Sequence, residues 1–159
     1  MSAERSFAKE VDSLRLGEGE VFHGEGILAV TKALLQSGVA YVGGYQGAPV
    51  SHLLDVLLDA GELMEEMGIH VETGTNEAVI GGALIVSGED YGEGASVIQE
   101  RTLSMAMKSS MWMVDPRPNL TSIVDTVENA FDLSEASNTP VIMQLRVRAC
   151  HVQGRFVAR

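Results

Sequence analysis

Helix-like and strand-like stretches alternate along the chain from about residue 27 to residue 147. Apolar residues in the helix-like stretches recur at helical spacing, whereas the strand-like stretches are short apolar runs. Strands separated by helices need crossover connections, which favour a mostly parallel sheet covered by helices on both faces. The sequence therefore predicts an α/β fold. The expected helices cover residues 27–36, 49–58, 95–108 and 119–137, and the expected strands cover 39–42, 69–71, 83–86, 111–114 and 140–147.

One connection in this pattern is too short for a parallel crossover. The strands expected at 69–71 and 83–86 are joined by residues 72–82 alone. A parallel pair of strands needs a crossover of roughly a dozen residues or more, usually built around a helix. These two strands are therefore expected to be antiparallel or not to be neighbours.

The length of 159 residues is that of one domain with a core of its own. Residues 1–20 form an N-terminal extension in this interpretation, and residues 21–159 form a single α/β domain. The two ends, residues 1–20 and about 148–159, are expected to be the most loosely held parts of the chain.

Charge and composition exclude several classes of function. A formal net charge of −11 argues against nucleic acid as a partner, because such binding depends on Lys and Arg. No apolar run approaches the ~18 residues that would indicate a membrane span. The first twenty residues lack the apolar core of a secretory signal, so a cytoplasmic protein is expected. A single cysteine, Cys150, cannot by itself hold an iron–sulfur cluster or a structural zinc ion.

Two loops at expected strand ends are candidate binding sites. The loop GGYQGAPVSH, residues 43–52, combines glycines with a helix start at Pro49, which suits a polar or anionic ligand. The same pattern is typical of an ordinary strand-to-helix turn. The segment Gly74-Thr75-Asn76-Glu77 carries a carboxylate that can exchange a proton with a bound heterocycle. Alternatively, Glu77 is a favourable charge at a helix start.

A third loop, residues 87–94, contains Glu89, Asp90 and Glu93 without the spacing of a calcium site, so no metal ligand is assigned. A solvated acidic loop that caps the next helix is the simpler interpretation. Gln99 and Arg101 follow it and are candidate contacts for a substrate carboxylate. The methionines nearby are expected to fill the core; they are Met105, Met107, Met111 and Met113.

Four segments together resemble the N-terminal domain of indolepyruvate ferredoxin oxidoreductases, members of the thiamine-diphosphate-dependent 2-oxoacid:ferredoxin oxidoreductase family. The resemblance extends over about residues 22–156, and the last two segments are long and distinctive. It implies the pyrimidine-binding domain of a thiamine diphosphate site, with the α/β fold of that type. The four segments are GGYQGAPVSH, TNEA, GGALIVSGEDYGEGASVIQERT and SEASNTPVIMQLRVRACHV.

The resemblance also implies roles for individual residues. Glu77 in TNEA matches the glutamate that, in thiamine enzymes, bonds N1′ of the aminopyrimidine and so promotes removal of the thiazolium C2 proton. Asn76, Gly47 and Pro49 are implied in cofactor binding. Ala48 is a candidate substrate contact, but it stands where the family more usually has a hydroxyl residue, which removes one hydrogen bond from this turn.

The chain departs from the family pattern after Ala78. Family members carry at least another βα unit, roughly 30 residues or more, before the GGALIV strand. Here only Val79 and Ile80 lie between Ala78 and Gly81, so the chain resembles a form with an internal deletion. The diphosphate- and Mg²⁺-binding domain and the iron–sulfur clusters of the family are expected in another domain or subunit.

The implied function is the pyrimidine-binding portion of an oxidoreductase that oxidatively decarboxylates indolepyruvate, other aryl pyruvates or other 2-oxoacids, with ferredoxin as electron acceptor. The isolated chain is expected to be inactive and to form a homo- or hetero-oligomer. Two alternatives remain open. The chain is either a truncated remnant that serves as an interaction domain, or an α/β domain that binds a small anion at the GGYQGAP loop.

Overall fold

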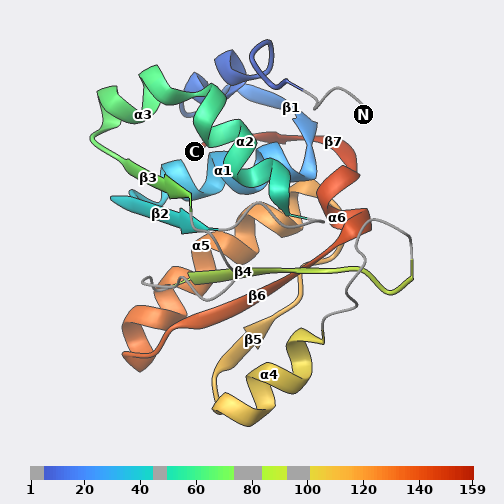
Figure 1. Cartoon of the computed structure of the whole chain (residues 1–159). Helices are drawn as coiled ribbons and strands as arrows, with labels where there is room; N and C mark the ends of the chain where they lie inside the picture. The colour runs from blue at the N-terminus through green and yellow to red at the C-terminus, as the bar shows by residue number, and fades with distance from the viewer. Residues whose placement is uncertain (1–5, 45–49, 74–83, 93–100) are drawn as a thin grey trace.

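A computed structural model describes residues 6–44, 50–73, 84–92 and 101–159 of the chain. Helices and strands alternate over much of its length, as Figure 1 shows. The described elements are η1 Val11–Arg15, β1 Val21–Glu25, α1 Gly26–Gln36, β2 Tyr41–Gly44, α2 Ser51–Asp59, α3 Gly61–Met67, β3 His70–Thr73, β4 Leu84–Glu89, α4 Thr102–Ser109, β5 Trp112–Val114, α5 Leu120–Ser137, β6 Val141–Arg146, α6 Val147–His151 and β7 Gln153–Val157.

The described strands form three small sheets, so the protein is α/β with both parallel and antiparallel pairing. Strands β2 and β3 are parallel, and β4, β6 and β5 form a second parallel sheet in that order. Strands β1 and β7 pair antiparallel, with Val21 opposite Val157. The expectation of parallel pairing is confirmed for β2–β3 and for β4–β6–β5, whereas the expectation of a single sheet is wrong for the described residues. The expectation that the strands near 70 and 84 are not neighbours is confirmed, because β3 and β4 belong to different sheets.

Helix α1 is the centre of the core. Every residue from Gly26 to Leu35 is buried, which is typical of a helix that is covered on all sides. It packs against α2, α5 and α6 and lies above the β4–β6–β5 sheet in Figure 1. The helix ends before Gly38, whose φ of +73° is a conformation that suits glycine.

The described parts of the two chain ends, residues 6–20 and 148–159, are packed into this domain, contrary to the expectation that they are loosely held. Phe7 is fully buried, and η1 lies against α1. Phe22 of β1 and Phe156 of β7 place their ring centroids 4.9 Å apart. The described part of the N-terminal extension, residues 6–20, therefore belongs to the same core as the rest of the domain.

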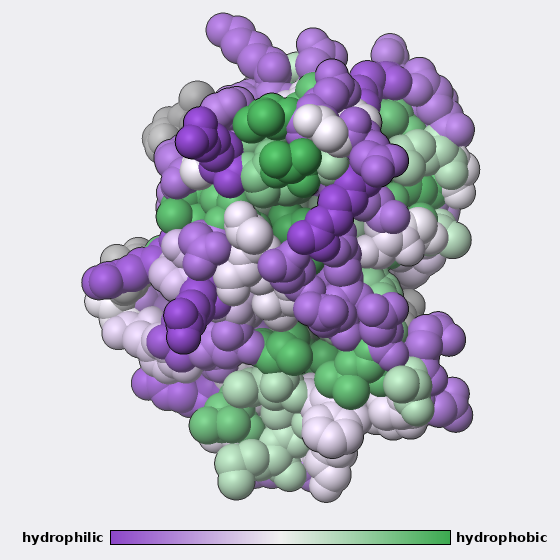
Figure 2. Space-filling model, turned by 180° about the vertical axis from the view of Figure 1, so that it is seen from behind, coloured by the Kyte–Doolittle hydropathy of each residue, from purple (hydrophilic) through white to green (hydrophobic). Residues whose placement is uncertain are grey.

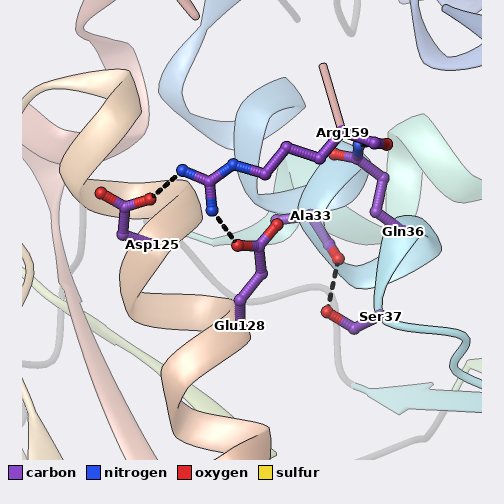
Figure 3. A network of polar contacts seen from close by, with 6 residues as sticks. All are labelled: Ala33, Gln36, Ser37, Asp125, Glu128 and Arg159. Atoms are coloured by element: carbon purple, nitrogen blue, oxygen red, sulfur yellow. Dashed lines mark hydrogen bonds and ion pairs between the residues drawn. The ribbon is translucent and has the colours of Figure 1, made fainter. Parts of the chain in front are cut away.

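A polar network holds the carboxyl-terminal residue (Figure 3). The Arg159 guanidinium contacts Asp125 at 2.6 Å and also bonds Glu128, both on α5. The Gln36 side chain at the end of α1 donates a hydrogen bond to the Arg159 carbonyl oxygen. These contacts attach the end of the chain to two helices of the core.

The methionines of α4 lie at the surface, so the expectation that they fill the core is wrong for them. Met105 is 57% exposed and Met107 is 74% exposed. Leu103 and Trp112 are also more than half exposed, and with these methionines they form what we call the α4 face. Figure 2 shows hydrophobic side chains at the end of the molecule where α4 and β5 lie. Helix α4 makes its main contacts with β5 and β6, which leaves these side chains on its outer side.

None of the described helices is long and apolar enough to cross a lipid bilayer.

The buried thiol of Cys150 on α6 should make folding sensitive to alkaline pH. Burial, with a smaller effect of the Glu25 charge, raises the pKa of Cys150 from 9.0 to about 12. The unfolded chain therefore loses this proton first, and the thiol's contribution to stability is lost as the pH rises above about 9. We expect urea denaturation under reducing conditions to show wild type losing about 2 kcal/mol relative to Cys150→Ala between pH 8 and about 10.5. A pH-independent difference between the two proteins would contradict this.

Candidate functional site

The carboxyl ends of β4, β5 and β6 meet at one edge of the second parallel sheet. Glu89 and Arg146, the last residues of β4 and β6, are paired in the register, and β5 ends at Val114 on the other side of β6. In open parallel sheets, ligands bind at this edge. A cleft of about 440 Å³ lies here, and we call it the strand-end cleft. It is lined by Glu89, Tyr91, Asp115, Pro116, Arg117, Pro118, Arg146, Val147, Arg148 and Ala149.

Arginines give the strand-end cleft a positive charge in a chain whose overall charge is strongly negative. Arg117, Arg146 and Arg148 line it, against the two carboxylates of Glu89 and Asp115. The guanidinium of Arg146 contacts Asp115 at 2.5 Å and lies 5.3 Å from the centroid of the Tyr91 ring. A carboxylate and an aromatic ring thus fix this arginine from two directions.

Two buried hydrogen-bond acceptors lie beside these arginines. Glu89 is 1% exposed; its Oε1 accepts a hydrogen bond from the Thr102 N–H, but its Oε2 has no partner among the described residues. Gln144 is 2% exposed, and its Oε1 also has no partner there, although its Nε2 is 3.4 Å from Asp115. Buried acceptors are nearly always paired in native proteins. The Tyr91 hydroxyl interacts with both side chains, but it forms no hydrogen bond of acceptable geometry with Glu89 Oε2 or Gln144 Oε1, so each oxygen has capacity for a further donor.

The neighbours of Glu89 favour its ionised form. Burial acts to raise the pKa of Glu89, but Tyr91, Thr102 and the charge of Arg101 outweigh it, so that the pKa is lowered. The expectation of a solvated acidic loop is wrong for Glu89 and Asp90, since each is 1% exposed. The expectation that this loop caps the next helix is confirmed for Glu89, because Thr102 is the first residue of α4.

A second polar cluster lies where α6 meets the starts of α1 and α2. His151 Nδ1 is 3.1 Å from Oε1 of the buried Glu25, and the rings of His151 and His52 are 5.9 Å apart. The described residues contain no group of three or more His, Cys, Asp or Glu side chains suited to a metal ion. We interpret the cluster as an anchor for α6, which carries Arg148 at the rim of the strand-end cleft.

Most of the residues selected from the sequence lie outside the described part of the chain. These are Glu77, Asn76, Gly47, Ala48, Pro49 and Gln99. Arg101 is described, and its guanidinium lies 5.0 Å from the centroid of the Tyr91 ring. Among the candidates from the sequence, Arg101 therefore lies next to the strand-end cleft, because it contacts Tyr91, which lines the cleft.

The attachment points of the two candidate loops are described. Gly44 ends β2 and Thr73 ends β3, and these two residues are paired across the parallel ladder. The segments that follow them, which contain Gly47 and Glu77, therefore leave the same sheet edge from neighbouring positions.

No family model matches the chain. No curated protein matches it either. What the chain does is therefore inferred from its own residues and geometry.

Sequence reasoning missed most of the residues that form the strand-end cleft. Asp115 and Arg117 follow the strand expected at 111–114, in a segment to which no site is assigned from the sequence, and Arg146 lies near the end of the strand expected at 140–147. A usable signal existed, because Asp115 and Arg146 each stand at the carboxyl end of an expected strand, where parallel sheets place ligands.

Proposed function

We propose that the chain is the pyrimidine-binding portion of a thiamine-diphosphate-dependent oxidoreductase. The proposed reaction is oxidative decarboxylation of a 2-oxoacid, such as indolepyruvate or another aryl pyruvate, with ferredoxin as the electron acceptor. The proposal includes the finer fold assignment, a pyrimidine-type thiamine-diphosphate-binding domain that lacks one βα unit. It rests on the four sequence segments that resemble the indolepyruvate ferredoxin oxidoreductases.

The observation that carries the proposal is the pairing of Gly44 with Thr73. The Gly47-Ala48-Pro49 turn follows the first of these residues, and Asn76-Glu77 follows the second. Both segments therefore start from one edge of a parallel sheet, which is the edge where α/β proteins bind ligands. A ligand held between them would have the Glu77 carboxylate on one side and the glycine-rich turn on the other.

Each partner in the proposed site has a separate task. Thiamine diphosphate, when bound, supplies the chemistry that stabilises the carbanion formed on decarboxylation. Glu77 of this chain holds a proton at N1′ of the aminopyrimidine, and a dry setting would raise the pKa of such a carboxylate toward neutrality. The chain has one cysteine, so iron–sulfur clusters would be held elsewhere.

The proposal requires a partner and an assembly of chains. A second domain or subunit would bind the diphosphate and Mg²⁺, and the isolated chain would not turn over. The exposed side chains of the α4 face support association, because apolar groups gathered at a surface favour contact with another protein. A chain that remained monomeric at micromolar concentration in light scattering would contradict the proposed self-association.

The test is a calorimetric titration of the purified chain with thiamine diphosphate and Mg²⁺. We expect saturable binding that Glu77→Gln weakens by about tenfold, the effect of losing one charged hydrogen bond. Glu65→Gln is the matched control, because Glu65 is an exposed acid on α3 and should leave the affinity unchanged.

Three results of this titration decide between the hypotheses. Binding that depends on Glu77 supports the proposal and justifies a search for the partner chain. Absence of binding by a folded protein contradicts it and favours a remnant that serves as an interaction domain. Equal binding by Glu77→Gln would mean that the carboxylate does not contact the cofactor.

A further inference from the structure

At the strand-end cleft, the structure describes both a hydrogen-bond donor and hydrogen-bond acceptors that lack a partner among the described residues. On one wall, the exposed Arg117 has no ion-pair partner among the residues that the structure describes. On the other wall, Glu89 Oε2 is a buried acceptor without a hydrogen-bond partner there. Gln144, on β6 two residues before Arg146, does not line the cleft, but its Oε1 is a second buried acceptor of this kind. An arginine is matched by an oxyanion, whereas buried acceptors are matched by an N–H or O–H group.

Two residues that line the strand-end cleft, Arg146 and Glu89, have fixed partners before any ligand arrives. Arg146 is fixed by Asp115 and by the Tyr91 ring. Glu89 Oε1 is fixed by the first backbone N–H of α4, and the Ser87 and Thr102 hydroxyls are 2.8 Å apart beneath it. A site that is already ordered loses little side-chain freedom when a ligand binds, which favours affinity.

We propose that the strand-end cleft binds a small molecule in which an oxyanion group, a carboxylate or a phosphate, lies next to a hydrogen-bond donor. The oxyanion meets Arg117 and the neighbouring cleft arginines. The adjacent N–H or O–H group meets Glu89 Oε2. A cleft of about 440 Å³ has the size typical of small-molecule sites, and its position at the strand ends agrees with this role.

The donor next to the oxyanion is what gives this site its selectivity. An anion without such a donor would bring negative charge near the ionised Glu89 and leave its Oε2 unpaired. A ligand with the donor satisfies that oxygen and separates the two negative charges by a hydrogen bond. Sites with buried polar groups discriminate strongly against analogues that lack the matching group.

The proposal is independent of thiamine diphosphate, and its test contains none. The probes are lactate and propionate, which share a carboxylate but differ in the hydroxyl group, and glycerol 3-phosphate as the phosphate counterpart. Backbone amide NMR titrations of the whole chain report binding at Tyr91, Arg117 and Ala149. We expect saturable shifts with lactate or glycerol 3-phosphate, and about tenfold weaker binding of propionate.

Variants identify the two walls separately. We expect Arg117→Ala to weaken binding of lactate and glycerol 3-phosphate by about tenfold, as loss of a charged hydrogen bond should. Arg155→Ala is the matched control, because Arg155 is an exposed arginine of β7 outside this cleft, and it should change nothing. Glu89→Gln should bring the affinities for lactate and propionate close together. If that variant does not fold, the affinities of the wild-type chain for lactate and propionate test the same wall.

Each outcome of the titrations either supports or overturns the proposed oxyanion site. Saturation by lactate alone assigns a carboxylate ligand, and saturation by glycerol 3-phosphate alone assigns a phosphate ligand; both support the proposal. Absence of saturable shifts with all probes at tens of millimolar overturns it. Unchanged affinity in Arg117→Ala, or equal affinity of lactate and propionate for the wild-type chain, also overturns it.

Discussion

Replacing Gly26 by alanine is expected to unfold the domain or to remove at least about 3 kcal/mol of its stability. A Cβ atom at this position would lie 1.7 Å from the carbonyl oxygen of Ala149 and 2.9 Å from its carbonyl carbon. Both are backbone atoms of α6, so no side-chain rotation relieves the overlap. The Gly26 N–H also donates a 2.8 Å hydrogen bond to the Val152 carbonyl oxygen, which fixes the two segments together. Urea denaturation followed by circular dichroism measures the loss.

Gly61→Ala is the matched control for this substitution. Gly61 is likewise the first residue of a helix, α3, but a Cβ there would meet no atom within 4 Å. We expect unchanged stability or a gain of up to about 1 kcal/mol, because alanine reduces the freedom of the unfolded chain. If Gly26→Ala were as stable as Gly61→Ala, the close packing of α1 on α6 would be wrong, and with it the positioning of Arg148 at the strand-end cleft.

The elements with strong local patterns were predictable from the sequence. In α5, the apolar residues Leu120, Ile123, Val124 and Val127 recur at helical spacing, and all four are buried. The helix begins after Asn119, whose side chain accepts a hydrogen bond from the Ser122 N–H as an N-cap. In such elements the local sequence and the tertiary contacts favour the same structure.

Elements that depend on distant partners were not predictable in this way. Strand β1 pairs with β7 at the other end of the chain, and neither VFHGE nor QGRFV shows a clear alternation of buried and exposed residues. The division into separate sheets also depends on long-range pairing, since β4 neighbours β6 and not β3. Local patterns carry little information about which strands pair.

The strand-end cleft was predictable as a location but not as a set of residues. The rule that ligands bind at strand ends selects the edge of a parallel sheet at which the cleft lies. Arg146 and Asp115 come together because β5 pairs with β6, and the local sequence does not show which strands pair.

The exposure of the α4 methionines could not be predicted for a similar reason. Composition alone does not show whether other elements cover a helix.

Replacing Lys32 by methionine is expected to remove about 2 to 4 kcal/mol of stability and to release the N-terminal segment. The Lys32 side chain is buried in α1, and its Nζ donates hydrogen bonds to the carbonyl oxygens of Leu14 and Leu16, at 2.7 and 2.5 Å. Burial lowers the pKa of Lys32. Methionine keeps the packing of the stem but leaves both carbonyl groups without this donor.

Substitution of an exposed lysine, Lys9, is the control that isolates the contribution of the buried Lys32 hydrogen bonds to stability. Lys9→Met removes the same charge from the surface of the same N-terminal segment, and we expect a change within about 0.5 kcal/mol. Limited proteolysis should cut Lys32→Met near η1 under conditions in which wild type and Lys9→Met stay intact, because η1 is held to α1 through Lys32. Equal stability and equal resistance of the two variants would mean that the burial of Phe7 and Leu14 alone holds the segment, and that the buried charge is dispensable for folding.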